Sequence, residues 1–333
     1  MMTEKIGIIC AGCWGTSLAQ AVAHSGGEVL LYTHEKDVIS TIKKEGMNKK
    51  YLPHIQLHPN ITPTHNLKAL LKECKTLILA APTMAISNIL APVKKYVTPE
   101  HTWIIASKGI EAETGALPSQ IVCRTLGFDA PLAILSGPVI AEELAQQQPC
   151  ALTLHSDDPE VLGRLENFLQ TPYTRIYFGD DPIGAQYCGA LRNVIAIAVG
   201  MSDGLGLGES ARAALITRGI AEVERYTVAH DGKSETVRGI SGAGDIILAS
   251  TSTHSRHYRF GSLIGQGMPV EEAYTIENSF IEGTQTGNVV MKRAVGQGID
   301  LAIISVVDGV LHGDLEPKRA FDMLLSRPRG YES

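Results

Sequence analysis

Apolar residues in the first 180 positions form short runs separated by segments with helical spacing. The runs are continuous rather than alternating, as expected for strands of a sheet that is covered on both faces. Near the end of this region, Asp158-Pro159 is a typical helix start, and apolar residues then recur at helical spacing as far as residue 169. The pattern predicts strands at residues 6–10, 29–32, 76–81, 103–106, 132–136, 151–155 and 175–178.

Strands that alternate with helices predict an α/β domain with a Rossmann-like, doubly wound parallel sheet. Beyond residue 182 the pattern changes, because strand-like runs nearly vanish and long helical segments dominate. We therefore expect two domains, at residues 1–182 and 183–333, the second of them all-helical. Its predicted helices lie at residues 184–200, 210–230, 271–276 and 282–294, with another that begins at Pro317.

Charge and composition narrow the classes of function. The 333 residues carry 29 Lys+Arg and 35 Asp+Glu, a formal charge of −6, which argues against nucleic acid or an anionic membrane as the main partner. The longest apolar stretch, residues 194–201, is far shorter than the ~20 residues of a membrane-spanning helix. Six scattered cysteines and no visible signal peptide favour a reduced, cytoplasmic protein.

The segment after the first strand is a candidate nucleotide-binding loop. Residues 10–15 read CAGCWG, in the place and spacing of G-x-G-x-x-G. Gly12 would let the backbone approach a pyrophosphate, which binds at a helix N-terminus, and Gly15 would let the helix pack on the strand. The alternatives are a tight turn with no ligand, or a redox pair of Cys10 and Cys13. No metal site is expected, because no further ligand pair accompanies this C-x-x-C.

The second strand is followed by His34, Glu35 and Lys36. An acid at this place holds the ribose diol of NAD, whereas a cation accommodates the 2′-phosphate of NADP. Because both types of side chain are present, NAD and NADP both remain possible.

Residues 187–200 contain a single charged side chain, Arg192, in an otherwise apolar or small-residue helix. A helix that is apolar all round is buried, and an unpaired buried cation is costly. Arg192 and Asn193 are therefore expected to face a polar cavity or an anion. The alternative is a structural ion pair with an acid of the domain core.

Three polar clusters also indicate a ligand. Residues 242–245, GAGD, form a predicted glycine-rich turn that ends in a carboxylate, and residues 254–257, HSRH, combine groups that suit a phosphate. Residues 107–109, SKG, follow a sheet strand at its C-terminal end, where such folds bind ligands. Together they predict a small anionic substrate.

Longer motifs then carry a family resemblance: CAGCWGTSLA, KKYLP, SKGIE, SGPVIAEE, GALRNVIAIAVGMSDGLGLG, ARAALITRG, GISGAGDIIL, SRHYRFG and FIEGTQTG, in this order. The chain resembles bacterial-type NAD(P)-dependent glycerol-3-phosphate dehydrogenase from end to end. The resemblance implies reduction of dihydroxyacetone phosphate to sn-glycerol 3-phosphate for phospholipid synthesis, by a cytoplasmic homodimer. It also implies a dinucleotide-binding first domain and a second domain for substrate and dimerisation.

The resemblance assigns roles to individual residues. Catalysis falls to Arg192, Lys108 and Asp245. The dinucleotide-binding set, which includes the two loop glycines, is Gly12, Cys13, Trp14, Gly15, His34, Tyr51, Lys108, Ala141, Arg256 and Glu282. The substrate-binding set is Lys108, Gly137, Asn193, Asp245, Ser255, Arg256 and His257.

Five site positions depart from the family's pattern. Arg192 replaces the catalytic lysine and His257 an asparagine, while the other replacements are Cys10 for glycine, Val139 for serine and Ala249 for threonine. Arginine can stabilise an alkoxide, but it does not readily give up a proton. Lys108 or His257 would then have to supply the proton through water. The departures also leave open a dehydrogenase of another substrate, or a catalytically weak dinucleotide-binding protein.

Overall fold

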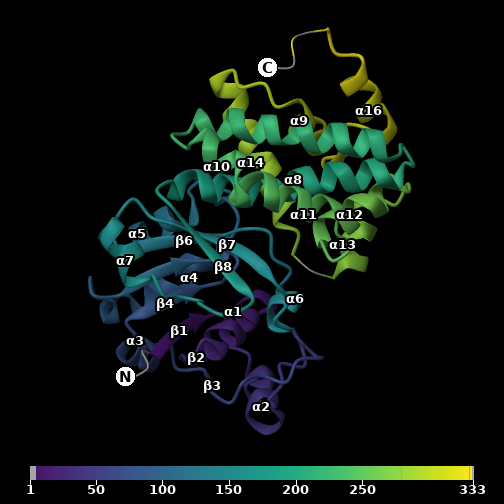
Figure 1. Ribbon diagram of the computed structural model, residues 1–333. Coiled ribbons are helices and arrows are strands. Elements are labelled where there is room, and N and C mark those ends of the chain that lie inside the picture. The colour runs from purple at the N-terminus through teal and green to yellow at the C-terminus, as the bar shows by residue number, and fades with distance from the viewer. Residues whose placement is uncertain (1–4, 279, 330, 332–333) are drawn as a thin grey trace. The chain divides into compact units, whose positions relative to one another are not determined.

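The computed structural model describes residues 5–278, 280–329 and 331 (Figure 1). The chain divides into two compact units. The first, here called the α/β unit, comprises Met1–Lys108 and Ala116–Gln186. The second, the helical unit, comprises Gly109–Gly115 and Tyr187–Ser333. All strands of the described residues lie in the α/β unit.

The α/β unit contains one eight-stranded sheet with the order β3-β2-β1-β4-β5-β6-β7-β8. All seven predicted strands are present. The strands are β1 (Lys5–Ile9), β2 (Glu28–Tyr32), β3 (Ile61–Thr64), β4 (Thr76–Leu79), β5 (Thr102–Ile105), β6 (Leu132–Ser136), β7 (Cys150–His155) and β8 (Thr174–Gly179).

Two features of the sheet differ from the prediction. The sheet is not parallel throughout, because β6 and β7 pair antiparallel. Strand β3 was not predicted, since its sequence ITPT is short and contains Pro63. Proline is tolerated here because β3 is an edge strand, paired only with β2.

Helices cover both faces of the sheet, which explains the continuous apolar runs. Ile8 belongs to one buried cluster and Ile9 to the other. The same division separates Ile78 from Leu79 in β4, because successive side chains of a strand point to opposite faces. The helices of this unit are α1 (Cys13–His24), α2 (Lys36–Glu45), α3 (Leu67–Glu73), α4 (Ile86–Leu90), α5 (Pro118–Leu126), α6 (Ala141–Ala145) and α7 (Pro159–Arg164). Helix α7 begins as predicted but ends before residues 165–169.

The helical unit is built around α8 (Pro182–Gly204), whose first five residues belong to the α/β unit. Among residues 184–202, all are buried except Arg192. The other helices are α9 (Glu209–Val228), α10 (Ser234–Arg238), α11 (Asp245–Thr251), α12 (Arg256–Gly265), α13 (Val270–Glu277), α14 (Glu282–Gln297), α15 (Ala302–Leu311) and α16 (Pro317–Leu325). The predicted glycine-rich turn before Asp245 is wrong in detail, because Ile240–Gly244 form a π-helical turn.

Glycines bring α8 and α12 into backbone contact. A Cβ atom on Gly200 would lie 2.1 Å from the carbonyl oxygen of Tyr258, and one on Gly261 would lie 2.2 Å from that of Ile197. Neither position has room for a side chain, so the two helices are held at one mutual register. No helix in the described part of the chain is long and apolar enough to cross a membrane.

Candidate active site

The loop between β1 and α1 places Gly12 and Gly15 at the start of helix α1, in two different environments. Gly12 is the N-cap residue of α1, and no side chain caps the helix there. A Cβ atom on Gly12 would meet nothing within 4 Å, so the backbone at this point is open to a ligand. A Cβ atom on Gly15 would lie 1.9 Å from the carbonyl oxygen of Cys10, so Gly15 is required for helix α1 to pack on the strand. This cradle fits a pyrophosphate at the helix N-terminus.

Cys10, at the place of the first glycine in the G-x-G-x-x-G pattern, has a backbone conformation that favours glycine. Its φ is +90°, a left-handed region that side chains with a Cβ atom rarely adopt. Burial raises the pKa of the Cys10 thiol, although a backbone hydrogen bond opposes this. No disulfide joins Cys10 and Cys13 in the described part of the chain. A protonated thiol is a poor nucleophile, so this environment argues against the redox pair.

Asn48, which the sequence analysis did not single out, holds the nucleotide-binding loop in place through hydrogen bonds. Its side chain is fully buried, and its Nδ2 donates to the carbonyl oxygen of Ala11 at 2.9 Å and to Oγ1 of Thr16 at 2.8 Å. Because Ala11 directly precedes Gly12, these bonds fix the open face of the loop. The only signal in the sequence was its place just before the KKYLP motif.

Other predicted residues gather at the carboxyl edge of the sheet. Trp14 Nε1 donates to the carbonyl oxygen of Ala106 at 3.2 Å, next to the end of β5. Lys108 Nζ donates to the carbonyl oxygen of Gly137, just after β6, at 3.5 Å. Ala141 begins α6, and half-buried Val139 lies two residues before it. Parallel strands β1, β4, β5 and β6 all end at this edge.

The end of β2 carries a charge cluster of Glu35, Lys50 and Tyr51. Tyr51 Oη donates to Oε1 of Glu35 at 2.7 Å, and Lys50 forms an ion pair with the same carboxylate. Partial burial would raise the pKa of Glu35, but the hydrogen bonds from Lys50 and Tyr51 outweigh it and hold the pKa below its usual value. His34, just before Glu35, is exposed. Glu35 is therefore ionised, and its charge is compensated inside the protein.

In the helical unit, Arg192 forms an ion pair with Asp245. Arg192 Nη1 lies 3.0 Å from Asp245 Oδ1, and 22% of the arginine side chain is exposed against 1% of the aspartate. The ion pair with a core acid, raised as an alternative from the sequence, is thus present. Arg192 Nε, however, is buried without a hydrogen-bond partner among the described residues. The guanidinium therefore retains donor capacity that Asp245 does not use.

The first turn of α12 carries Ser255, Arg256 and His257, and these three side chains have different environments. Ser255 is the N-cap, and its Oγ accepts a hydrogen bond from the backbone N–H of Tyr258 at 3.4 Å. Arg256 is exposed, whereas His257 is buried. His257 Nε2 accepts a hydrogen bond from the backbone N–H of Gly283 at 3.1 Å.

This environment keeps the His257 imidazole neutral. Burial lowers its pKa well below the usual value, and the positive charges of Arg256 and Arg192 add to the effect. The predicted role of His257 as a proton source is therefore disfavoured, because its Nε2 already serves as an acceptor. Glu282 directly precedes the Gly283 that His257 contacts, and Asn193 is also buried.

A hydrogen-bond network that anchors α12 to α8 was also not predicted from the sequence. The carboxylate of Asp203, at the end of α8, accepts hydrogen bonds from Tyr258 Oη at 2.7 Å and from Arg212 Nε at 2.9 Å. Tyr258 follows His257 directly, so this network ties the same turn of α12 to α8.

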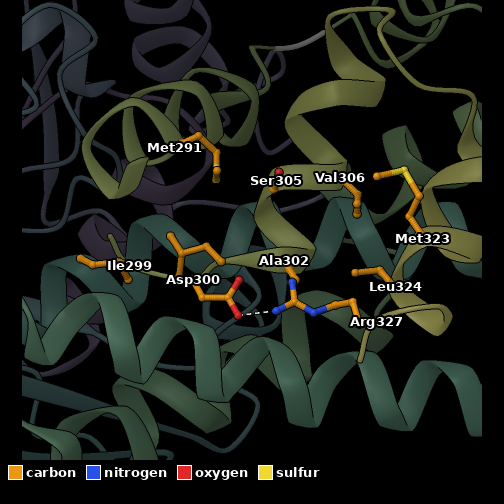
Figure 2. Close-up of a pocket in the computed structure, with 10 residues that line it drawn as sticks. Met291, Ile299, Asp300, Ala302, Ser305, Val306, Met323, Leu324 and Arg327 are labelled. Atoms are coloured by element: carbon orange, nitrogen blue, oxygen red, sulfur yellow. Dashed lines mark hydrogen bonds and ion pairs between the residues drawn. The ribbon is translucent and has the colours of Figure 1, made fainter. Parts of the chain in front are cut away.

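A cavity of about 230 Å³ lies elsewhere in the helical unit (Figure 2). Its walls come from α14, α15, α16 and the segments beside them, and an ion pair joins Arg327 to Asp300 at its side. None of its lining residues is a predicted site residue.

Comparison with known proteins decides the family. Residues 5–162 match the model of the NAD-dependent glycerol-3-phosphate dehydrogenase N-terminus, and residues 181–322 match that of its C-terminus. The chain belongs to this family. A relative from Rhodospirillum rubrum named glycerol-3-phosphate dehydrogenase (NAD(P)+) is 37% identical over 325 residues, which are 98% of this chain and 93% of that protein. A Geobacillus kaustophilus protein of the same name is 37% identical over 99% of this chain and 96% of its own length.

A solved structure supports both the family and the fold. The glycerol-3-phosphate dehydrogenase of Coxiella burnetii is 35% identical and has a TM-score of 0.92, covering 98% of this chain and 99% of that one. The resemblance inferred from the motifs is thereby confirmed, together with the Rossmann-like and helical halves.

Proposed function

We propose that this chain is an NAD(P)-dependent glycerol-3-phosphate dehydrogenase that reduces dihydroxyacetone phosphate to sn-glycerol 3-phosphate. The observation that carries the proposal is the match of both halves to this family, with relatives of that name aligned over nearly their whole length. The product supplies phospholipid synthesis. We also propose a cytoplasmic homodimer, with residues 1–182 for the dinucleotide and residues 183–333 for substrate and dimerisation.

The α/β unit offers a binding site for the cofactor. The open backbone at Gly12 and the uncapped N-terminus of α1 would hold the pyrophosphate. Cys13 and Trp14 continue this turn, and Ala141 begins helix α6. His34 and Tyr51 would contact the ribose end of the dinucleotide. The reduced nicotinamide, when bound, supplies the hydride that the carbonyl carbon receives.

The residues of the helical unit would act on the substrate. Arg256 has an exposed guanidinium suited to a phosphate, with Ser255 beside it. Arg192 stabilises the negative charge that develops on the carbonyl oxygen, and Asp245 fixes the orientation of its guanidinium. Asn193 and Gly137 would complete the contacts with the substrate.

The alkoxide oxygen also needs a proton, which arginine supplies poorly. With the Nε2 of His257 engaged by Gly283, Lys108 is our proposed proton source, because its ammonium group is a donor. The two alternatives from the sequence, a different substrate and a catalytically weak dinucleotide-binding protein, draw on the five departures at the site, whereas the match to the family favours the reductase.

Steady-state oxidation of NADH and of NADPH tests the proposal, with dihydroxyacetone phosphate and with unphosphorylated dihydroxyacetone. We expect turnover only with the phosphorylated ketone. Arg256→Ala should raise KM for the phosphorylated ketone by at least about 10-fold, as expected for loss of a charge-assisted phosphate contact. Tight binding of NADH without turnover of any ketone in a panel would instead favour the weak binding protein. Sedimentation equilibrium tests the homodimer.

A further inference from the structure

His257 links two helices whose first turns carry proposed ligand-binding residues. It belongs to α12, which begins with Arg256, and its Nε2 accepts the backbone N–H of Gly283 in α14 at 3.1 Å. Helix α14 begins with Glu282, the residue directly before Gly283. A buried imidazole thus joins the turn with Arg256 to the turn with Glu282.

The N-terminus of α14 depends on this bond, because no side chain of its own caps it. The N-cap residue is Ile281, which offers no side-chain acceptor. A backbone N–H in the first turn of a helix needs an acceptor from outside the helix, and His257 provides one. The imidazole therefore acts as a helix cap supplied by another helix.

Close packing around Gly283 restricts the geometry of its hydrogen bond with His257. A Cβ atom on Gly283 would lie 2.9 Å from Cδ2 of His257 and 3.1 Å from the backbone carbon of Asn193. The glycine lets α14 approach both α12 and α8 at this point. One turn later, a Cβ atom on Gly287 would make an ordinary contact of 3.6 Å with Val194.

The two ends of the bond are not equally well held. The turn of α12 is also anchored by the Tyr258–Asp203 hydrogen bond and by the glycine contacts of α12 with α8. At the turn of α14, the N-cap residue Ile281 adds no side-chain cap of its own to the bond from His257. Loss of the bond should therefore displace Glu282 more than Arg256.

We propose that His257 is a positioning residue that holds the first turn of α14, and with it Glu282, in the conformation that binds the dinucleotide. This replaces the direct contact with substrate that the resemblance implied for residue 257. The inference rests on the proposed function, because it takes Glu282 as one of the dinucleotide-binding residues that the family resemblance assigns.

Three substitutions separate positioning from direct substrate contact. Glutamine can place an oxygen near the position of Nε2, asparagine is too short to do so, and phenylalanine keeps the ring without an acceptor. His257→Gln should retain KM for the cofactor within about 2-fold. His257→Asn and His257→Phe should raise it by at least about 5-fold, the lower end of what an unsatisfied buried donor costs, with KM for dihydroxyacetone phosphate nearly unchanged.

Gly283→Ala, with Gly287→Ala as its matched control in the same helix, tests the same contact from the other side. Only Gly283→Ala should weaken cofactor binding. If His257→Asn keeps full cofactor affinity while His257→Gln and His257→Phe raise KM for dihydroxyacetone phosphate, residue 257 contacts substrate and the proposal is wrong.

Amide hydrogen exchange gives a readout that does not need activity. Peptides covering the first turn of α14 should exchange faster in His257→Asn and His257→Phe than in the parent or in His257→Gln. Equal exchange in all four proteins would overturn the proposal, as would faster exchange with unaltered cofactor affinity. A parent that reduces no ketone would refute the proposed function instead, and calorimetric affinity for NADH or NADPH would then replace KM in this test.

Discussion

Arg192 and Asp245 form an ion pair of 3.0 Å in the helical unit, at a position where the resemblance described above implies a lysine in place of the arginine. The aspartate is almost completely buried, so its charge needs this partner. In the proposed mechanism the arginine therefore has two tasks, to compensate Asp245 and to stabilise an alkoxide. A lysine could perform both and could also transfer a proton.

Arg192→Lys should raise kcat by at least about 10-fold, because it restores a titratable donor near the carbonyl oxygen. Arg192→Ala should abolish turnover, since it removes the charge at the oxyanion and leaves Asp245 without this cation. Rates of the three proteins are compared across pH 6–9. Arg238→Lys, in an exposed ion pair with Glu224, is the matched control and should not change kcat. A fast parent that the lysine does not improve would show that another group already supplies the proton.

The two glycines of the nucleotide loop should respond differently to substitution. Gly12→Val puts a side chain into open space that the phosphates would occupy, so the protein should fold normally but bind NADH and NADPH about 10-fold or more weakly. Gly15→Ala places a methyl group against the carbonyl oxygen of Cys10, so it should lower the free energy of unfolding by about 1–3 kcal/mol or more. Calorimetry and urea unfolding measure the two effects. Unchanged cofactor affinity in Gly12→Val would contradict the assignment of the loop.

The strained backbone of Cys10 predicts a stabilising substitution. A left-handed conformation costs a residue with a Cβ atom about 1–2 kcal/mol, whereas glycine adopts it freely. Glycine also makes the unfolded chain more flexible, which offsets about 0.4–1 kcal/mol. Cys10→Gly should therefore raise the free energy of unfolding by about 1 kcal/mol. Cys123→Gly, in the helix α5, should lower it, and urea unfolding of both proteins checks the contrast.

Those features that depend on continuous patterns could be predicted from the sequence. Adjacent apolar residues such as Ile8 and Ile9 revealed a sheet covered on both faces, and the single charge of residues 187–200 pointed to Arg192. The antiparallel pairing of β6 with β7 could not be predicted, because hydrophobicity does not encode strand direction. The role of His257 was equally hidden, since its partner Gly283 is 26 residues away and contributes only a backbone N–H.

The cluster at the end of β2 should set the preference between NADH and NADPH. Glu35→Gln removes a negative charge and frees Lys50, so KM for NADPH should fall relative to that for NADH by up to about 5-fold. Lys50→Ala should shift the ratio the other way, because Glu35 then repels the 2′-phosphate. Lys49→Ala, whose neighbouring ion pair is with Glu45, should leave the ratio unchanged. The same ratio in all four proteins would mean that this cluster does not approach the ribose.

Glu222 should make the stability of the protein depend on pH. Its buried carboxylate, on α9, accepts hydrogen bonds from the backbone N–H of Ile303 at 2.7 Å and of Ile304 at 3.2 Å, in the first turn of α15. Burial raises its pKa from 4.5 to about 7, although these bonds and the nearby charge of Arg225 oppose the rise. The unfolded chain thus releases this proton at a lower pH than the folded protein does.

The sign of the effect follows from that difference. Between pH 4.5 and about 7 the folded state binds more protons, so the contribution of Glu222 to stability is largest in acid and is lost as the pH rises through 7. The pKa difference corresponds to about 3 kcal/mol. Glu222→Gln keeps an acceptor but cannot ionise, so its free energy of unfolding relative to the parent should increase by about that amount from pH 4.5 to 8.

Urea unfolding of both proteins at several pH values measures this increase. Glu224→Gln is the control, because hydrogen bonds from Ser234 and Arg238 lower the pKa of Glu224, so that carboxylate stays ionised throughout most of this range. Its difference from the parent should stay nearly constant above pH 5. A constant difference for Glu222→Gln as well would mean that the N–H groups of α15 keep Glu222 ionised in acid, and that burial does not control its proton.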